Sequence, residues 1–184
     1  MQAAYGQLAE RGFEGLRTRE VAAEVGVNIA TLHYYFPTKE SLIRGVLEHA
    51  MGRFRSTLAP HGSPADQLRN HLRAVRDLLR DEPGLGSVMA ELALRSARDE
   101  SIHAIVTETF EAWHTTTRGL LRRGVREGKL RRELDSEGVA ALIVATLTSL
   151  TLPVTSGSEH GDHALRQLEK WLGVAGPRSR ESSN

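Results

Sequence analysis

The residues best able to do chemistry lie in one short run, "NIATLHYYF", at residues 28–36. This run holds one histidine and three aromatic rings, in a chain with only two Trp, three Tyr and four Phe. The run reads as a short helix that starts at Asn28, so its free amide groups can face phosphates. The small Ala30 and Thr31 would allow close approach to base edges. Recognition of nucleic acid is therefore one interpretation, and a packing cluster of Tyr34, Tyr35 and Phe36 is the alternative.

A second group of side chains that could bind a ligand, here a metal ion, lies in "SGSEHGDH". In this run His160 and His163 stand three residues apart beside Glu159 and Asp162. Such a spacing can hold a metal ion when it falls on a helix. The flanking glycines and serines favour a solvated loop, so we predict no metal site. The chain also lacks cysteine and a glycine-rich phosphate loop. We therefore expect neither a cofactor nor an enzyme.

Composition favours a helical protein. Of the 184 residues, 26% are charged and 40% are apolar, with few aromatic rings, which is typical of amphipathic helices. We predict an all-α fold. The formal net charge is only +1, so a nucleic-acid interpretation must depend on particular residues and not on bulk charge.

Localisation is expected to be cytoplasmic. The absence of cysteine fits a reducing compartment, and the first residues lack a basic start followed by an apolar run. The charge-free stretch 138–158 contains seven Ser or Thr residues, one proline and two glycines. Its apolar part is too short for a membrane span, which needs about 20 residues, so no membrane partner is predicted.

The periodicity of apolar residues predicts a series of helices that must position these side chains. Short helices are expected at 3–11, 18–25 and 29–35, and a longer one from Thr38 to about Leu58, before the linker "APHGSP". We divide the chain into a DNA-binding domain at 1–50, a second helical domain at 51–174 and a loose tail at 175–184. The further helices expected beyond the linker include 102–126, 137–152 and 164–172.

Residues 18–36 have the layout of a helix-turn-helix. Gly26 can take a positive φ in the turn, and Ala22 allows the two helices to approach closely. Thr31, Tyr34 and Tyr35 are left to point outward. The apolar wedge between the helices is expected to consist of Val21, Val25, Val27 and Leu32.

The helix expected at 137–152 is apolar around its whole circumference, so it must be buried in a core or an interface. In a domain of this size both surroundings are needed, which indicates an oligomer.

The run "AAYGQLAERGFEGLRTREVAAEVGVNIATLHYYFPTKESLIRGVLEH" resembles the DNA-binding domain of the tetracycline-repressor (TetR) family of transcriptional regulators. The rest of the chain resembles that family only in layout. The resemblance implies a helix-turn-helix domain followed by a helical ligand-binding and dimerisation domain. Helices 137–152 and 163–172 would pair with those of a second copy in a four-helix interface.

The resemblance also assigns roles to single residues. Thr18, Arg19 and Lys39 would contact phosphates, and Tyr34 and Tyr35 would lie beside the DNA backbone. Leu32 and Phe36 would belong to the small core. The part of the recognition helix that faces the major groove would consist of Ile29, Ala30, Thr31 and His33, following Asn28.

Three departures from the family pattern affect these roles. His33 stands where tyrosine is usual, so it contacts a base, a phosphate or neither. Ile29 cannot donate a hydrogen bond and could read a base only through an apolar contact. The chain also begins almost inside the first helix, so either the start is truncated or the contacts of a basic arm are missing.

The implied function is that of a one-component regulator that binds a palindromic operator in double-stranded DNA as a homodimer. Ligand-relieved repression is the commoner mode of the family, and activation is the other. Candidates for the cavity of the small-molecule effector are His103, Phe110, Trp113 and His114. Phe110 and Trp113 are equally well explained as plain core, and His103 as a surface residue. The alternative function is a helical ligand-binding dimer whose DNA reading is weak or lost.

Overall fold

The computed structural model describes residues 1–58, 61–152, 154–155 and 158–174. Within these ranges the chain forms nine α-helices and no strand, which confirms the predicted all-α fold. The predicted tail at 175–184 lies outside the described residues. The helices are α1 (Gln2–Gly15), α2 (Thr18–Glu24), α3 (Ile29–Tyr35), α4 (Lys39–Ser56), α5 (Pro64–Asp81), α6 (Pro83–Ser96), α7 (Glu100–Arg126), α8 (Ser136–Ser149) and α9 (Glu159–Leu172).

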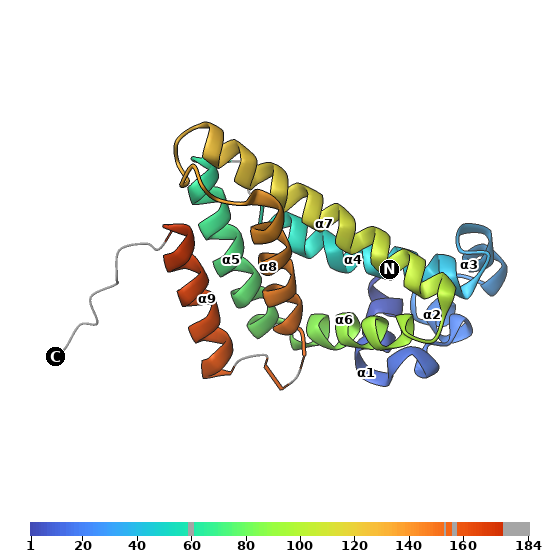
Figure 1. The fold of residues 1–184 in the computed structure, drawn as a ribbon. Coiled ribbons are helices and arrows are strands. Elements are labelled where there is room, and N and C mark those ends of the chain that lie inside the picture. Colours follow the sequence, from blue (N-terminus) through green and yellow to red (C-terminus); the bar gives the residue numbers. More distant parts are fainter. Residues whose placement is uncertain (59–60, 153, 156–157, 175–184) are drawn as a thin grey trace.

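The helices gather at two ends of an elongated molecule (Figure 1). Helices α1, α2 and α3 lie together at one end, which we call the head, while α5, α8 and α9 lie at the other end. Helices α4, α6 and α7 run between them, and α1 packs against α6. The head is therefore connected to the remainder by several helices and not by a single linker.

Local sequence signals explain where the helices of the head begin and end. Gly26 has φ 72° in the turn between α2 and α3, as predicted. The side chain of Thr38 accepts a hydrogen bond from the Ser41 amide, and the Ser41 side chain accepts one from the Thr38 amide. This reciprocal cap starts α4 directly after Pro37, which cannot continue α3.

Two sequence expectations were wrong. Helix α9 begins at Glu159 and not at Ala164, because the hydroxyl of Ser158 accepts a hydrogen bond from the Gly161 amide at 3.0 Å and caps it. His160 and His163 therefore lie on a helix and not in a loop. No group of three possible metal ligands occurs in the described part of the chain.

The second error concerns the apolar wedge of the helix-turn-helix. Val25 and Val27 are 48% and 38% exposed, because the turn at Gly26 carries them away from the helix interface. The buried wedge consists of Val21, Ala22 and Leu32. The head therefore has a smaller core than its sequence suggests.

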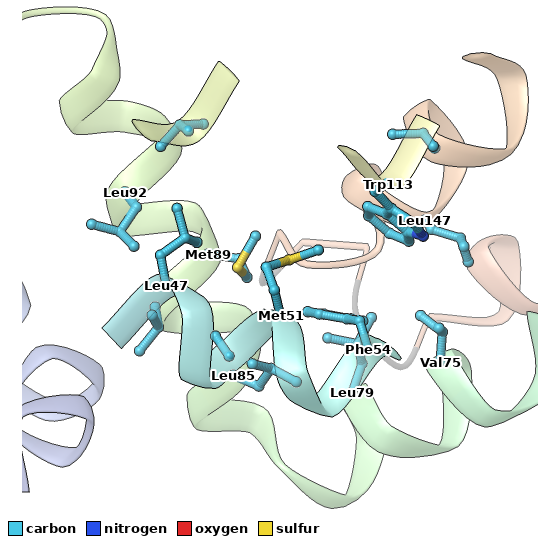
Figure 2. Packing of buried hydrophobic residues seen from close by; sticks show 14 of the residues in the cluster. Leu47, Met51, Phe54, Val75, Leu79, Leu85, Met89, Leu92, Trp113 and Leu147 are labelled. Atoms are coloured by element: carbon cyan, nitrogen blue, oxygen red, sulfur yellow. The ribbon is translucent and has the colours of Figure 1, made fainter. Parts of the chain in front are cut away.

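Helix α4 contributes to the packing of both ends. Its first half buries Leu42 and Ile43, and its second half buries Met51 and Phe54. Figure 2 shows Leu47, Met51 and Phe54 lying among labelled side chains of α5, α6 and α7. The ring of Phe54 stacks on that of Trp113 with centroids 5.5 Å apart. These residues belong to one continuous hydrophobic cluster, so a movement of α4 would change the packing at both ends of the molecule.

A buried chain of hydrogen bonds joins α4, α5 and α7. The indole N–H of Trp113 donates to Nε2 of His71 at 3.2 Å, and Nδ1 of His71 lies 2.6 Å from the hydroxyl of Thr57. That hydroxyl donates to the carbonyl of Phe54 at 2.6 Å. Since Nε2 must accept, a neutral ring carries its proton on Nδ1 and donates it to Thr57. Each of the three donors in this series of hydrogen bonds, on Trp113, His71 and Thr57, therefore has an acceptor.

None of the helices in the described ranges is both long enough and apolar enough to cross a membrane.

The buried ring of His71 makes stability depend on pH. Burial lowers its pKa from 6.5 to about 4. Above pH 6.5 the ring is neutral in both states. Between pH 6.5 and 4 only the unfolded ring takes up a proton, so the free energy of unfolding falls by up to about 3 kcal/mol. Urea unfolding at pH 7.5 and 4.5 should show this loss in the wild type.

The control for this prediction is His71→Gln, which keeps one donor and one acceptor but does not titrate. Its loss of stability between pH 7.5 and 4.5 should be smaller than that of the wild type by about 2.5 kcal/mol. Equal losses in the two proteins would show that His71 is not the group responsible.

Candidate nucleic-acid interface and adjoining cavity

Helix α3 projects its polar and aromatic side chains from the head. Oδ1 of Asn28 accepts hydrogen bonds from the amide and the hydroxyl of Thr31, at 2.8 and 3.1 Å. This cap starts the helix as predicted. Tyr34 and Tyr35 are 80% and 69% exposed, with their rings edge to face and the centroids 5.2 Å apart. Two large rings are thus held against each other on the surface and not in the core.

The structure places the ten residues predicted to contact DNA on or next to α2, α3 and the start of α4. Leu32 is buried and Phe36 is half-buried against the core, so their packing roles fit the prediction. Ile29 also packs partly against the core. Six of the ten are exposed: Arg19, Asn28, Ala30, His33, Tyr34 and Tyr35. The half-buried ones are Thr18, Ile29, Thr31 and Lys39.

The ammonium group of Lys39 has a partner within the protein. Its Nζ donates to the carbonyl of Phe13 at 3.0 Å and lies 4.0 Å from the centre of the Phe13 ring. Partial burial, the largest cause, lowers the pKa of Lys39. In this conformation the predicted phosphate contact is therefore held against the end of α1.

Phe13 is also the point where the head meets α6. Gly12 has φ 67° and breaks α1, which frees the Phe13 amide to donate to the carboxylate of Glu91 at 2.8 Å. The guanidinium group of Arg95 lies 4.3 Å from the ring centre of Phe13. We call this set of contacts the Phe13 junction. Only the break in α1 could be predicted from the sequence, from the glycines around Phe13. The contacts with Glu91 and Arg95 could not, because these residues are distant from Phe13 in the chain.

A cavity of about 180 Å³ lies between α4 and α7. The ion pair between Arg44 and Glu108, 2.6 Å long, forms part of its wall. From α4 the lining consists of Arg44, Glu48, Met51, Phe54 and Arg55, followed by Leu58 after the helix end. From α7 it consists of Ile105, Glu108, Thr109, Ala112, Trp113 and Thr116.

Of the four predicted cavity residues, the structure brings only Trp113 to this cavity. His103 is exposed, and Nε2 of His114 lies 3.3 Å from the carbonyl of Glu137 on α8. Phe110 packs beside Trp113 with the ring centroids 6.2 Å apart, but it does not line the cavity. A helix turns by about 100° per residue, so positions 103, 110 and 114 lie on the opposite side of α7 from positions 105, 109, 112 and 116.

Comparison with known protein families identifies the chain. A family model described as "Bacterial regulatory proteins, tetR family" matches residues 1–46. A second, described as "Tetracyclin repressor-like, C-terminal domain", matches residues 58–167, more than half of the chain. The protein belongs to the TetR family of transcriptional regulators. Members of this family are DNA-binding regulators and not enzymes, which agrees with the prediction from the sequence.

Individual relatives support the same assignment. The nucleoid occlusion factor SlmA of Pasteurella multocida is 32% identical over 126 residues, which cover 66% of this chain and 63% of that protein. The chain thus spans less than two thirds of that relative. The HTH-type transcriptional regulator YdeS of Bacillus subtilis is 27% identical over 99% of this chain and 91% of its own.

A solved structure shows the same fold. The crystal structure of a Rhodococcus protein assigned to the TetR family superposes with a TM-score of 0.83, at 22% identity and over 94% of each chain.

The Asn28 cap offers a direct test of how α3 is held. Asn28→Ala should lower the free energy of unfolding by about 1 kcal/mol, because the Thr31 amide at the start of α3 loses its acceptor. Asn28→Asp keeps a side-chain oxygen and should unfold close to the wild type. Urea unfolding followed by circular dichroism measures both, and equal stability of the Ala and Asp variants would contradict the capping role.

Proposed function

We propose that this TetR-family protein is a ligand-relieved repressor that binds a palindromic operator as a homodimer. The observation that carries the proposal is the pair of exposed rings on α3, Tyr34 and Tyr35, which contribute little to the core of the chain. Rings that pack poorly in the free protein are explained if they contact a partner. The family supplies the partner class, which is double-stranded DNA.

In the proposed complex α3 enters the major groove, where Thr31 and His33 face base edges and Ile29 offers an apolar edge. Residues 1–50 then act as the DNA-binding domain and 51–174 as the ligand-binding and dimerisation domain. The remaining contacts position the head on the DNA backbone. They are made by Thr18, Arg19, Asn28, Ala30, Tyr34, Tyr35 and Lys39.

The homodimer is proposed to form through α8 and α9. Helix α8 carries no charged side chain after Glu137, yet this chain alone leaves one of its faces exposed, including Ala141, Leu142 and Ala145. On α9 the ring of Trp171 is also exposed. A second copy would cover these apolar surfaces, and its two-fold axis would set two half-sites about one helical turn apart, ~34 Å.

The cavity between α4 and α7 is the proposed effector site. Helix α4 runs from the head to this cavity, so a ligand that fits one position of α4 better than another shifts the population of DNA-binding dimers. The alternative function is a ligand-binding dimer that recognises DNA only weakly. Two observations favour that alternative, namely the partial packing of Ile29 in the core and the engagement of Lys39 at Phe13.

Arg19 tests the DNA interface. A palindromic operator is selected from randomised DNA, and binding is measured by fluorescence anisotropy at several salt concentrations. Arg19→Gln should weaken binding to all sequences alike and reduce the log–log salt slope by about 1, because one phosphate contact is lost.

The matched control is Arg126→Gln, which removes the same charge at the far end of α7 (Figure 1). It should leave affinity and slope almost unchanged. A wild type without sequence-specific, salt-dependent binding would exclude the repressor and favour the alternative function.

Leu142 tests the dimer. It is 45% exposed on α8, and Leu142→Arg should give monomers, because two opposed arginines would have to be buried without partners. Sedimentation velocity should show the loss of the dimer, and affinity for the palindrome should fall at least tenfold. Leu94→Arg changes a 63% exposed leucine on α6 and should remain dimeric. A dimeric Leu142→Arg variant would exclude the proposed interface.

A further inference from the structure

The cavity between α4 and α7 continues into a second hollow of about 250 Å³ farther along α7. Both hollows are lined by Leu58 and Thr116, so they adjoin. Their main contacts on α7 recur every three or four residues and fall on one face of the helix. On a helix that rises 1.5 Å per residue, this face is about 27 Å long. It consists of Ile105, Thr109, Ala112, Thr116, Gly119 and Arg123. We call the two hollows together the α4–α7 groove.

The walls of the groove are mainly apolar, with Met51, Phe54 and Trp113 in the first hollow and Leu120 in the second. Two threonines also line it, but their hydroxyl protons are already donated. Thr109 donates to the carbonyl of Ile105 at 2.8 Å, and Thr116 donates to that of Ala112 at 2.9 Å. The strong hydrogen-bond donors left for a ligand are therefore the arginine side chains.

Neither the backbone nor the packing of the described residues requires a glycine at position 119. It lies inside α7, where glycine is less favourable than alanine, and its φ is not positive. Apart from its own neighbours in α7, a Cβ placed on it would meet nothing within 4 Å among the residues that the structure describes. A side chain would therefore fit without a clash, but it would project into the second hollow that Gly119 lines. Glycine at this position keeps the groove open.

The charges along the groove are arranged unevenly. Near the head, Arg44 is paired with Glu108, which leaves Glu48 as the unneutralised charge there. Farther along, Arg55 lines the groove and makes no ion pair or side-chain hydrogen bond with any residue that the structure describes. An anionic group would thus be repelled by Glu48 and attracted by Arg55. At the far end Arg123 is held by Gln67 at 2.6 Å.

We propose that the effector is an organic carboxylate with an extended apolar body that lies along the α4–α7 groove. Its carboxylate binds Arg55, and its body passes Thr116 to the open space at Gly119. This inference rests on the proposed function in one respect, that the groove is the effector site. It adds the chemical class of the ligand and its direction in the groove.

Three probes with the same alkyl chain test the class: decanoate, 1-decanol and decylammonium. Each is titrated into the full chain by calorimetry, below the concentration at which the probe aggregates. Decanoate should bind once per protomer and at least tenfold more tightly than the other two, because only it is an anion that can form charge-assisted hydrogen bonds with Arg55. Tighter binding of decylammonium, equal binding of all three, or no binding of decanoate would overturn the proposal.

Two variants locate the ligand. Arg55→Gln should weaken decanoate binding about tenfold, while Arg126→Gln, with the same loss of charge elsewhere on the chain, should not. Gly119→Phe fills the second hollow and should abolish binding, while Thr107→Phe adds the same ring on the opposite side of α7 and should not. Unchanged decanoate binding in Arg55→Gln or Gly119→Phe would overturn the assignment. If Gly119→Phe does not fold, Arg55→Gln still decides.

Operator binding by the same samples separates this inference from the proposed function. A wild type that does not bind its operator even without a probe contradicts the repressor. A wild type that binds its operator but not decanoate contradicts only the ligand class. Release of the operator by decanoate, reduced in Arg55→Gln, would support both.

Discussion

The position of α4 depends on the buried hydrogen-bond chain from Trp113 through His71 to Thr57. It fixes the C-terminal end of α4 against α5 and α7, close to the stacked rings of Phe54 and Trp113. His71 and Trp113 are buried and Thr57 is half-buried, and a polar group left there without a partner costs about 1–3 kcal/mol. Only one arrangement of protons satisfies all of them, namely a neutral imidazole protonated on Nδ1. The free protein therefore favours one position of the far end of α4.

A fixed end makes α4 useful as a connection to the head. The first half of the helix buries Leu42 and Ile43 and packs against α1, which packs against α2, and α2 packs against α3. A shift of α4 therefore reaches α3 through α1 and α2. The Phe13 junction supplies a second connection, in which Glu91 and Arg95 of α6 hold the broken end of α1. Lys39 joins the two connections, because it belongs to α4 and contacts Phe13. The head is thus held by α4 and α6 together.

Much of this arrangement could be predicted from the sequence, because its signals are local. Asn28 caps α3, Gly26 takes the positive φ of the turn, and the apolar period of α7 gives a helix close to its observed length. The contacts that position the site are not local. Glu91 is 78 residues from Phe13 and His71 is 42 residues from Trp113, and neither pair has a spacing that marks it. The residues predicted to line the cavity lie on two different faces of α7. An apolar pattern shows that a helix face is buried, but it does not indicate beside which face the neighbouring helix leaves a cavity.

The nature of these contacts limits how a ligand in the α4–α7 groove could act on the head. The ion pair of Arg44 and Glu108 joins α4 to α7 at the wall of the groove, but both side chains are largely exposed, and such pairs contribute at most about 1 kcal/mol. Breaking it would change a two-state equilibrium by less than about tenfold. The packed contact of Phe54 with Trp113 lies beside the same groove and cannot deform gradually, because close-packed rings have few alternative arrangements. A large effect on DNA binding therefore requires a ligand that displaces the second half of α4 from Trp113, and the head would have to follow because it shares that helix.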